Sequence, residues 1–356
     1  MGISNTRWFR VSIAIILCLV IIWLANEVKF IFTPLIIFVQ TLFTPFLIAG
    51  VLFYLCRPLL HWLEGRKVPR GIGIVVIFLV IAGLLTFVIS FIGPIIQKQF
   101  VNLVHNTPKM IDSVQKGIHY WQEHQQFIPQ YVKEGVTYIT DSLGDIVAVT
   151  GSSIGTLLSN TVSLVVALAI VPFILFYLLS DRDKFVPSVI RFFPSSKTDY
   201  IRGILGDMDK ALASYIQGQL IVSTCIGVLL LIGYLIIGLD YALLLALFGM
   251  VMNIIPFLGP FLAVIPAIIA AWLQDPIMVV YVIIIMFAAQ QIESSFVSPL
   301  VMGRALKIHP LTIILLILVG GNLAGVLGMI LIIPIYAVCK VIVQHSYRLL
   351  KINKST

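Results

Sequence analysis

Asn253-Ile254-Ile255-Pro256-Phe257-Leu258-Gly259-Pro260 lies at the middle of an apolar stretch of 33 residues, Tyr241–Leu273. Gly320-Gly321-Asn322-Leu323-Ala324-Gly325 interrupts a second stretch of 33 residues, Leu311–Val343, in the same way. An α-helix rises about 1.5 Å per residue, so a straight helix of this length would overshoot a hydrocarbon core of about 30 Å by roughly 20 Å. A hairpin that enters the membrane, turns and leaves by the same face would fit. The sequence therefore favours two re-entrant hairpins over two fully spanning helices.

Each break leaves backbone groups outside helical geometry at membrane depth. Such backbone is tolerated only where protein or a water-filled cavity satisfies it, and paired broken segments point to a transporter's binding site. We therefore expect a substrate or ion pathway at the two breaks. Its predicted residues are Asn253, Pro256, Gly259, Pro260, Gly321, Asn322, Gly325 and Gly328. For the two asparagines, a structural role at freed carbonyl groups and contact with a polar ligand are equal alternatives.

The composition is that of an all-α polytopic membrane protein in a lipid bilayer. Hydrophobic residues make up 60% of the chain, charged residues 11%, and the mean hydropathy is +1.08. A soluble domain carries about 25% charged residues. The net charge of +8 comes from basic residues beside apolar runs, which indicates membrane topology and not nucleic-acid binding. The four cysteines lie in or beside apolar runs without a CxxC pair, so no disulfide framework is expected.

Full spans are predicted at 11–26, 30–55, 71–93, 155–179, 214–238 and 277–299. The first is read as an uncleaved helix, because no small-x-small cleavage site follows its apolar run. The predicted regions are membrane helices at 1–93, extracytoplasmic amphipathic helices at 94–150, a fourth span with a basic cytoplasmic loop at 151–213, a transport core at 214–343 and a basic cytoplasmic tail at 344–356. His119 and His124 lie in the second region without the acidic or cysteine cluster that would complete a metal site.

The distribution of basic residues predicts cytoplasmic N- and C-termini in a bacterial cytoplasmic membrane. Sixteen of the 23 lysines and arginines then lie inside, in the N-terminus, two loops and the C-terminus. The loop Met302–His309, with Arg304 and Lys307, is inside only if both hairpins are re-entrant. The first hairpin would then enter from outside and the second from inside.

A weak internal repeat agrees with this inverted arrangement. Asn253, Gly259 and Leu262 share their spacing with Asn322, Gly328 and Leu331. Chance similarity between two apolar, glycine-rich stretches is the alternative explanation.

No catalytic or nucleotide-binding motif is present, since P-loop, H-E-x-x-H and G-x-S-x-G are all missing from the sequence. We therefore expect neither an enzyme nor a cofactor. Active transport would draw on an ion or proton gradient, or on a partner subunit.

A polar cluster stands out in the span before the second hairpin, and its residues are Gln290, Gln291, Glu293 and Ser298. A charged side chain at the bilayer centre costs about 2.5–3.5 kcal/mol on insertion scales, so it needs a partner, a proton or water. We favour a carboxylate that lines the pathway and couples transport to protonation. The alternative is that Glu293 lies near the interface and pairs with Arg304.

A second polar stripe begins the fifth span, with Asp207, Lys210, Ser214 and Gln217 spaced three or four residues apart. Asp207, Lys210 and Gln217 are candidates for an inner gate. A solvated amphipathic turn is the favoured alternative.

The C-terminal half resembles the autoinducer-2 exporter-like (AI-2E) transporter family of bacteria. The resemblance is carried by Tyr215–Gln219, Asn253–Pro260, Gln290–Glu293, Ser298-Pro299, His309-Pro310-Leu311 and the glycines from Gly320 to Gly328 with Pro334. It implies an oligomer, such as a pentamer, and an elevator-like motion. Members of the family are described as exporters of the quorum-sensing molecule autoinducer-2, and some as sodium–proton antiporters.

The leading hypothesis is a secondary transporter that exports a small polar solute similar to autoinducer-2, driven by an ion or proton gradient. The alternative is a monovalent cation (sodium)/proton antiporter. It ranks lower because tight sodium binding favours a cluster of oxygen ligands, and the membrane segments offer a single carboxylate. A third hypothesis is a non-transporting membrane scaffold, because fold alone does not establish transport.

Overall fold

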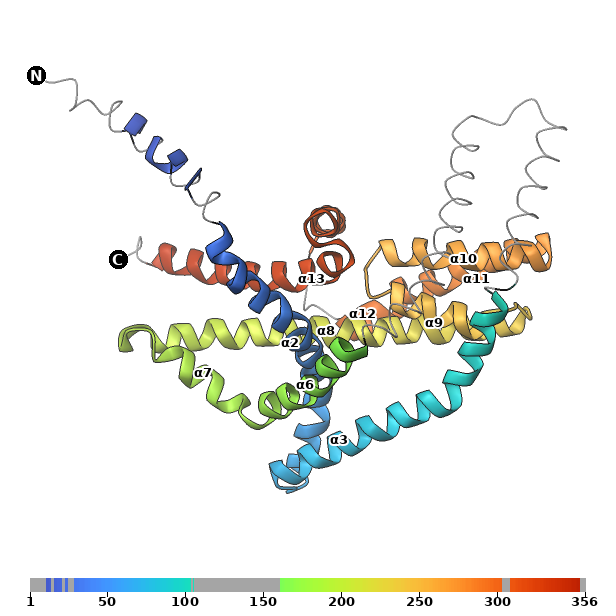
Figure 1. Cartoon of the computed structure of the whole chain (residues 1–356), viewed down its shortest axis with the longest axis horizontal. Helices are drawn as coiled ribbons and strands as arrows, with labels where there is room; N and C mark the ends of the chain where they lie inside the picture. The colour runs from blue at the N-terminus through green and yellow to red at the C-terminus, as the bar shows by residue number, and fades with distance from the viewer. Residues whose placement is uncertain are drawn as a thin grey trace, which may run out of the picture. The chain divides into compact units, whose positions relative to one another are not determined.

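The computed structural model describes residues 11–13, 16–20, 23–24, 29–103, 105, 161–302 and 308–352. All regular secondary structure in these residues is helical (Figure 1). Five helices are long and apolar enough to cross a membrane, namely Thr33–Gly65, Arg70–Leu103, Thr198–Ile236, Pro276–Met302 and Pro310–Tyr347. The prediction of an all-helical membrane protein is therefore confirmed.

The elements, with their bounds, are α2 (Lys29–Gly65), α3 (Arg70–Phe87), η2 (Val88–Ile92), α6 (Thr161–Ser180), α7 (Arg182–Ile190), η3 (Ser195–Lys197), α8 (Thr198–Ile236), α9 (Ala242–Met252), α10 (Leu258–Gln274), α11 (Pro276–Ile292), η4 (Glu293–Val297), α12 (Ser298–Met302) and α13 (Pro310–Ile352). Four predicted spans coincide with long helices. The spans 11–26 and 155–179 and the extracytoplasmic region after residue 105 lie partly or wholly outside the described residues.

Several helices extend beyond the predicted spans. The helix α8 begins at Thr198 where the sequence predicts a span from 214, and α2 continues to Gly65. Helical backbone also continues through 93–103, inside the region predicted to be extracytoplasmic. Hydropathy marks only the apolar part of a helix, whereas the helical hydrogen bonds continue into polar ends.

The chain forms two compact units. The first consists of Met1–Phe53 and Thr161–Leu178, and the second of Tyr54–Asn160 and Leu179–Thr356. Within the second unit, α8, α9, α10 and α11 pack side by side (Figure 1). Their core includes Leu230 and Tyr234 of α8, Ala267 of α10 and Val282 of α11, all almost fully buried.

Two wide helical turns share a sequence signal. Both η2 and η4 are π-helical, and each ends two residues before a proline, Pro94 or Pro299. Proline lacks a backbone N–H and its ring clashes with the carbonyl four residues earlier. A π-turn widens the helix at that carbonyl, so the helix passes the proline without ending.

Hairpin 1 consists of α9 and α10, joined by residues 253–257. The turn is made by Phe257, whose φ of 61° lies in the left-handed region. The arms of 11 and 17 residues measure about 16 and 25 Å, so neither arm alone would cross a 30 Å hydrocarbon core. A Cβ at Gly259 would overlap the carbonyl oxygen of Met252, so glycine is required where the two arms meet.

Hairpin 2 lies within α13, which is broken at Ala324 (φ −146°) and Gly325 (φ 58°, ψ −141°). Gly320 and Gly328 face one another across the turn, and a Cβ on Gly328 would overlap the carbonyl oxygen of Gly320. The two predicted breaks are therefore confirmed. Gly259 and Gly328, which the repeat predicted to be equivalent, both permit close approach of two arms. The membrane face from which each hairpin enters stays a prediction.

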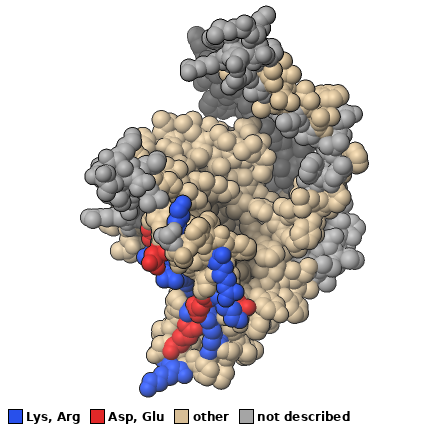
Figure 2. Space-filling view, turned by 90° about the vertical axis from the view of Figure 1, so that its left-hand side faces the viewer, with Lys and Arg blue, Asp and Glu red and all other residues tan. Residues whose placement is uncertain are grey.

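Charged side chains of the second unit gather in one region of the face shown in Figure 2. One charged cluster is centred on Arg70, whose guanidinium donates two hydrogen bonds to Leu179 O, at 2.6 and 2.9 Å, and one to Asp183 at 2.6 Å. Arg182 pairs with Glu64 at 2.9 Å. Partial burial alone would raise the pKa of Asp183, but the hydrogen bond and charge of Arg70, together with Arg182, hold this pKa below its usual range. The cluster joins the end of α2, the start of α3 and the start of α7.

Replacing Gly259 by alanine should lower the thermal stability of the purified protein in detergent. The added methyl group meets backbone, which cannot yield as a flexible side chain can, so we expect a cost of at least about 1–3 kcal/mol. The control is Gly206→Ala in α8, where no heavy atom lies within 4 Å and alanine favours the helix. A melting temperature for Gly259→Ala equal to that of the control would contradict the close approach of the arms.

Candidate functional site

A row of polar side chains runs along one face of α8. Tyr215, Gln219 and Ser223 are spaced four residues apart, so they lie on neighbouring turns of the same face. Their exposed fractions are 6%, 6% and 2%. We call these three residues the α8 row; at about 1.5 Å per residue it is roughly 12 Å long.

The α8 row holds the turn of hairpin 1. Gln219 Nε2 donates a hydrogen bond of 2.7 Å to the backbone oxygen of Asn253, the residue that caps the C-terminus of α9. This carbonyl belongs to the last turn of a helix, where intrahelical partners run out. Asn253 is itself only 3% exposed, so without Gln219 its oxygen would be buried and unpaired.

Glu293 begins the wide turn η4, and Gln290 and Ser298 lie beside its carboxylate. These three side chains of the predicted polar cluster therefore lie together. A π-turn takes more residues than an α-turn, which accommodates the five-residue spacing between Glu293 and Ser298.

The position of η4 along α8 follows from two close contacts. Gly233 of α8 lies against Ile285, and Gly218 lies against Met302, so α8 and the helix 276–302 are antiparallel. Glu293 lies between Ile285 and Met302, and η4 packs on α8. Glu293 therefore lies beside the stretch of α8 between Ser223 and Gly233, about one helical turn beyond Ser223.

Among the residues that the structure describes, five buried polar atoms of the α8 row, the hairpin 1 turn, the end of α11 and η4 have no hydrogen-bond partner. They are Tyr215 Oη, Ser223 Oγ, Asn253 Nδ2, Gln290 Nε2 and Glu293 Oε2. Leaving such a group unpaired costs about 1–3 kcal/mol. The two hydroxyls and the amide of Asn253 can donate to a polar solute, and the carboxylate of Glu293, beside which Gln290 lies, can accept from it or take up a proton.

The other predicted pathway residues fall into two groups. Pro256, Gly259 and Pro260 form the turn and first residues of α10 in hairpin 1. Gly321, Asn322 and Gly325 belong to the turn of hairpin 2, where Asn322 is exposed and donates a 3.1 Å hydrogen bond to Leu318 O in its own helix. Gln291 is also exposed and donates to Ser295 Oγ at 3.1 Å.

The two hairpins meet at Ile255. This residue of the hairpin 1 turn packs with Tyr215, Ile317 and Ile333 in one buried cluster. Ile317 and Ile333 lie about two helical turns from Gly325, so the turn of hairpin 1 packs with the arms of hairpin 2.

The three gate candidates tie α8 to other helices. Asp207 pairs with His345 of α13 at 2.9 Å and with Lys210 at 3.9 Å. Gln217 Nε2 donates to Tyr54 O of α2 at 2.7 Å. Their role as a gate stays a prediction.

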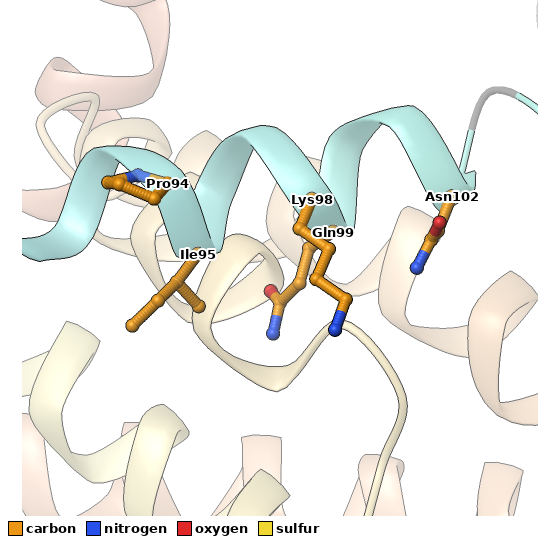
Figure 3. A pocket seen from close by; sticks show the side chains of 5 residues that line it. All are labelled: Pro94, Ile95, Lys98, Gln99 and Asn102. Atoms are coloured by element: carbon orange, nitrogen blue, oxygen red, sulfur yellow. The ribbon is translucent and has the colours of Figure 1, made fainter.

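An open hollow of about 470 Å³ lies beside the helical residues 93–103, lined by Pro94, Ile95, Lys98, Gln99 and Asn102 (Figure 3). Gln99 Oε1 accepts a 2.9 Å hydrogen bond from the backbone N–H of Leu244, in the first turn of α9. Gln99 therefore satisfies the N-terminus of the helix whose C-terminus Gln219 satisfies. Gln99 thus has a structural role, and it lies at the end of α9 that is away from Asn253.

The α8 row was missed as a site by the sequence analysis. Tyr215 and Gln219 were named only as part of the family resemblance, and Ser223 was not named as a candidate. The signal was present, because polar residues at a four-residue spacing in an otherwise apolar helix mark one face.

Replacing Gln219 by leucine should destabilise the turn of hairpin 1, because the Asn253 carbonyl then loses its partner in an apolar core. We expect a loss of about 1–3 kcal/mol, seen as a lower melting temperature and faster hydrogen exchange around residues 250–256. The matched control is Gln344→Leu on the exposed surface of α13. Unchanged exchange in this segment would argue against the structural role of Gln219.

Comparison with known proteins agrees with this architecture. Residues 10–348 match the family model described as AI-2E family transporter. "Putative transport protein YueF" of Bacillus subtilis is 36% identical over 353 residues, covering 96% of this chain and 94% of that protein. "Putative transport protein YrrI" of the same organism is 29% identical, with 96% of each chain covered. "Putative permease PerM" of Escherichia coli K12 is 26% identical, with 87% and 89% covered.

Proposed function

Because the chain belongs to the AI-2E family of transporters, we propose that it exports a small polar solute similar to autoinducer-2, as a secondary transporter. The family is one of transporters and not of enzymes, and the chain is a multi-pass membrane protein. Names of transport protein and permease among its relatives support the general activity. The solute, its outward direction and its driving gradient are our proposal.

The observation that carries this proposal is the group of unpaired buried atoms at the broken helices. Side chains of α8, the hairpin 1 turn, the end of α11 and η4 supply them. In a transporter they would bind the solute in place of water. Glu293 would bind a proton or the solute in alternation, which links transport to a proton gradient.

An elevator-like motion would carry the site as one body. Gln219 binds the turn of hairpin 1 to α8, and Ile255 packs that turn on hairpin 2. The helices α8 to α13 would then move together, while the spans before them supply the oligomer contacts. The subunit number, for which a pentamer is the expectation, is part of the same proposal.

Sodium/proton antiport is the second candidate, favoured by one observation, the buried carboxylate of Glu293. Hard cations prefer a shell of oxygen atoms. Among the described residues, no group of three or more histidine, cysteine or acidic side chains is placed to hold a metal ion. The mixture of amide nitrogens and hydroxyls around Glu293 suits a polar solute better.

The re-entrant topology predicts that residue 307 faces the cytoplasm. We expect Lys307→Cys, in a background with Cys18, Cys56, Cys225 and Cys339 replaced, to react with an impermeant maleimide only after the cells are permeabilised. Lys354→Cys in the predicted cytoplasmic tail is the matched control. Labelling of residue 307 in intact cells would mean that both broken segments cross the membrane.

Glu293→Gln should abolish the dependence of transport on a proton gradient and leave folding intact. Proteoliposomes loaded with autoinducer-2 should release it under an imposed pH gradient with the wild-type protein, and the variant should lose this acceleration. Asp240→Asn, at an exposed helix end, is the control and should behave as wild type.

Parallel vesicles with sodium and pH gradients but no organic solute separate the two candidates. Sodium-driven proton movement there, abolished by Glu293→Gln, would replace solute export by antiport. An unaltered pH response in Glu293→Gln would remove Glu293 from the coupling step.

A further inference from the structure

We propose that the α8 row and η4 form a charge-selective binding site, which accepts neutral or singly cationic solutes rich in hydroxyl or amino groups and excludes anions. This inference rests on the proposed function and specifies its substrate class. It begins with a property of the chain: residues 211–303 contain no lysine, arginine or histidine. Residues 310–339, which include both arms of hairpin 2 near its turn, contain no charged residue at all.

Every segment that contributes to the site lies in these two ranges. The α8 row, Asn253, Gln290 and Glu293 belong to the first, and Ile317 and Ile333, which pack on the hairpin 1 turn, belong to the second. The basic residues that the structure places nearest along α8 are before residue 211, where Lys210 already pairs with Asp207. Within these segments, a solute would therefore meet the Glu293 carboxylate and no positive side chain.

This charge arrangement decides which ionic form can bind. A buried charge is tolerated only where an opposite charge or several hydrogen bonds compensate for its lost hydration. An anion such as a carboxylate or phosphate would find no counter-ion and would be repelled by ionised Glu293. An ammonium group would be compensated by Glu293, and a neutral hydroxyl needs only hydrogen-bond partners.

The unpaired atoms of the α8 row can supply those hydrogen-bond partners, and they are spaced along the helix. Tyr215 Oη and Ser223 Oγ lie one helical turn on either side of Gln219, and both can donate or accept. Asn253 Nδ2 adds a donor at the level of Gln219, whose amide nitrogen is already occupied by the Asn253 backbone. A solute with several adjacent hydroxyl or amino groups satisfies this set, whereas an apolar solute would leave all of it unpaired.

The α8 row also allows function to be separated from folding. Because Tyr215 Oη and Ser223 Oγ have no partner in the part of the chain that the structure describes, the double variant Tyr215→Phe/Ser223→Ala loses none of the hydrogen bonds seen there. We expect it to melt at or slightly above the wild-type temperature in the absence of solute.

The test uses three probes with the same carbon skeleton, namely glycerol, 3-amino-1,2-propanediol and glycerate, which are neutral, cationic and anionic near pH 7. Binding to the full-length protein in detergent is measured as a saturable rise in melting temperature. The double variant provides the baseline for non-specific stabilisation by polyols. We expect half-saturating concentrations at least tenfold lower for the first two probes than for glycerate, and no saturable rise in the double variant.

Glu293→Gln should weaken the binding of the amine relative to that of glycerol, because the ammonium group then loses its counter-ion. Saturable binding of glycerate comparable to that of glycerol, or equal binding by the double variant, would overturn the inference. Absence of saturable binding by both glycerol and the amine would overturn it as well. These outcomes are independent of the vesicle assay: charge-selective binding without solute export would refute the proposed function alone, and export without such selectivity would refute this inference alone.

Discussion

Backbone groups in an apolar environment must find partners inside the protein, and the structure of the second unit depends on how the broken helices meet this demand. The break after α9 frees the Asn253 carbonyl, and Gln219 binds it at 2.7 Å. At the other end of α9, Gln99 accepts from Leu244 N–H. A glutamine at each end therefore replaces the helical partners that a continuous helix would have supplied. The short helix can then exist within the core.

Around the same break, the backbone groups have hydrogen-bond partners, whereas several side-chain polar atoms have none. The described backbone at the hairpin 1 turn is satisfied by Gln219 and by local turns such as Gly259 N–H to Ile255 O at 2.9 Å. In contrast, Tyr215, Ser223 and Asn253 each keep a buried atom without a partner among the described residues. A protein selected only for stability would replace such groups with apolar ones of similar shape. Their concentration around one turn is what motivates a binding role.

Much of the fold could be predicted because its signals are local. Glycine and proline in stretches longer than a bilayer requires revealed both breaks. The α8 row was harder to find, because three polar residues scarcely change the mean hydropathy of a long apolar helix. The repeat was informative only in part. Gly259 and Gly328 have the same role. Asn253 is buried and Asn322 is exposed, because hairpin 1 turns at Phe257, four residues after its asparagine, and hairpin 2 turns at Gly325, three residues after its own. Contacts between hairpins, such as Ile255 with Ile317, depend on tertiary packing that no local pattern encodes.

The turn η4 contains one residue more than an α-helical turn would. Each residue in an α-helix corresponds to a rotation of about 100°, so tightening this turn would rotate the helix beyond it, from Ser298 onward, by that angle relative to α11. Pro299 opposes the tightening because its ring would clash with the carbonyl of Ser295. Pro299 therefore holds η4 in its wide form. The helix from Ser298 onward keeps its rotation relative to α11, and Ser298 stays beside the Glu293 carboxylate.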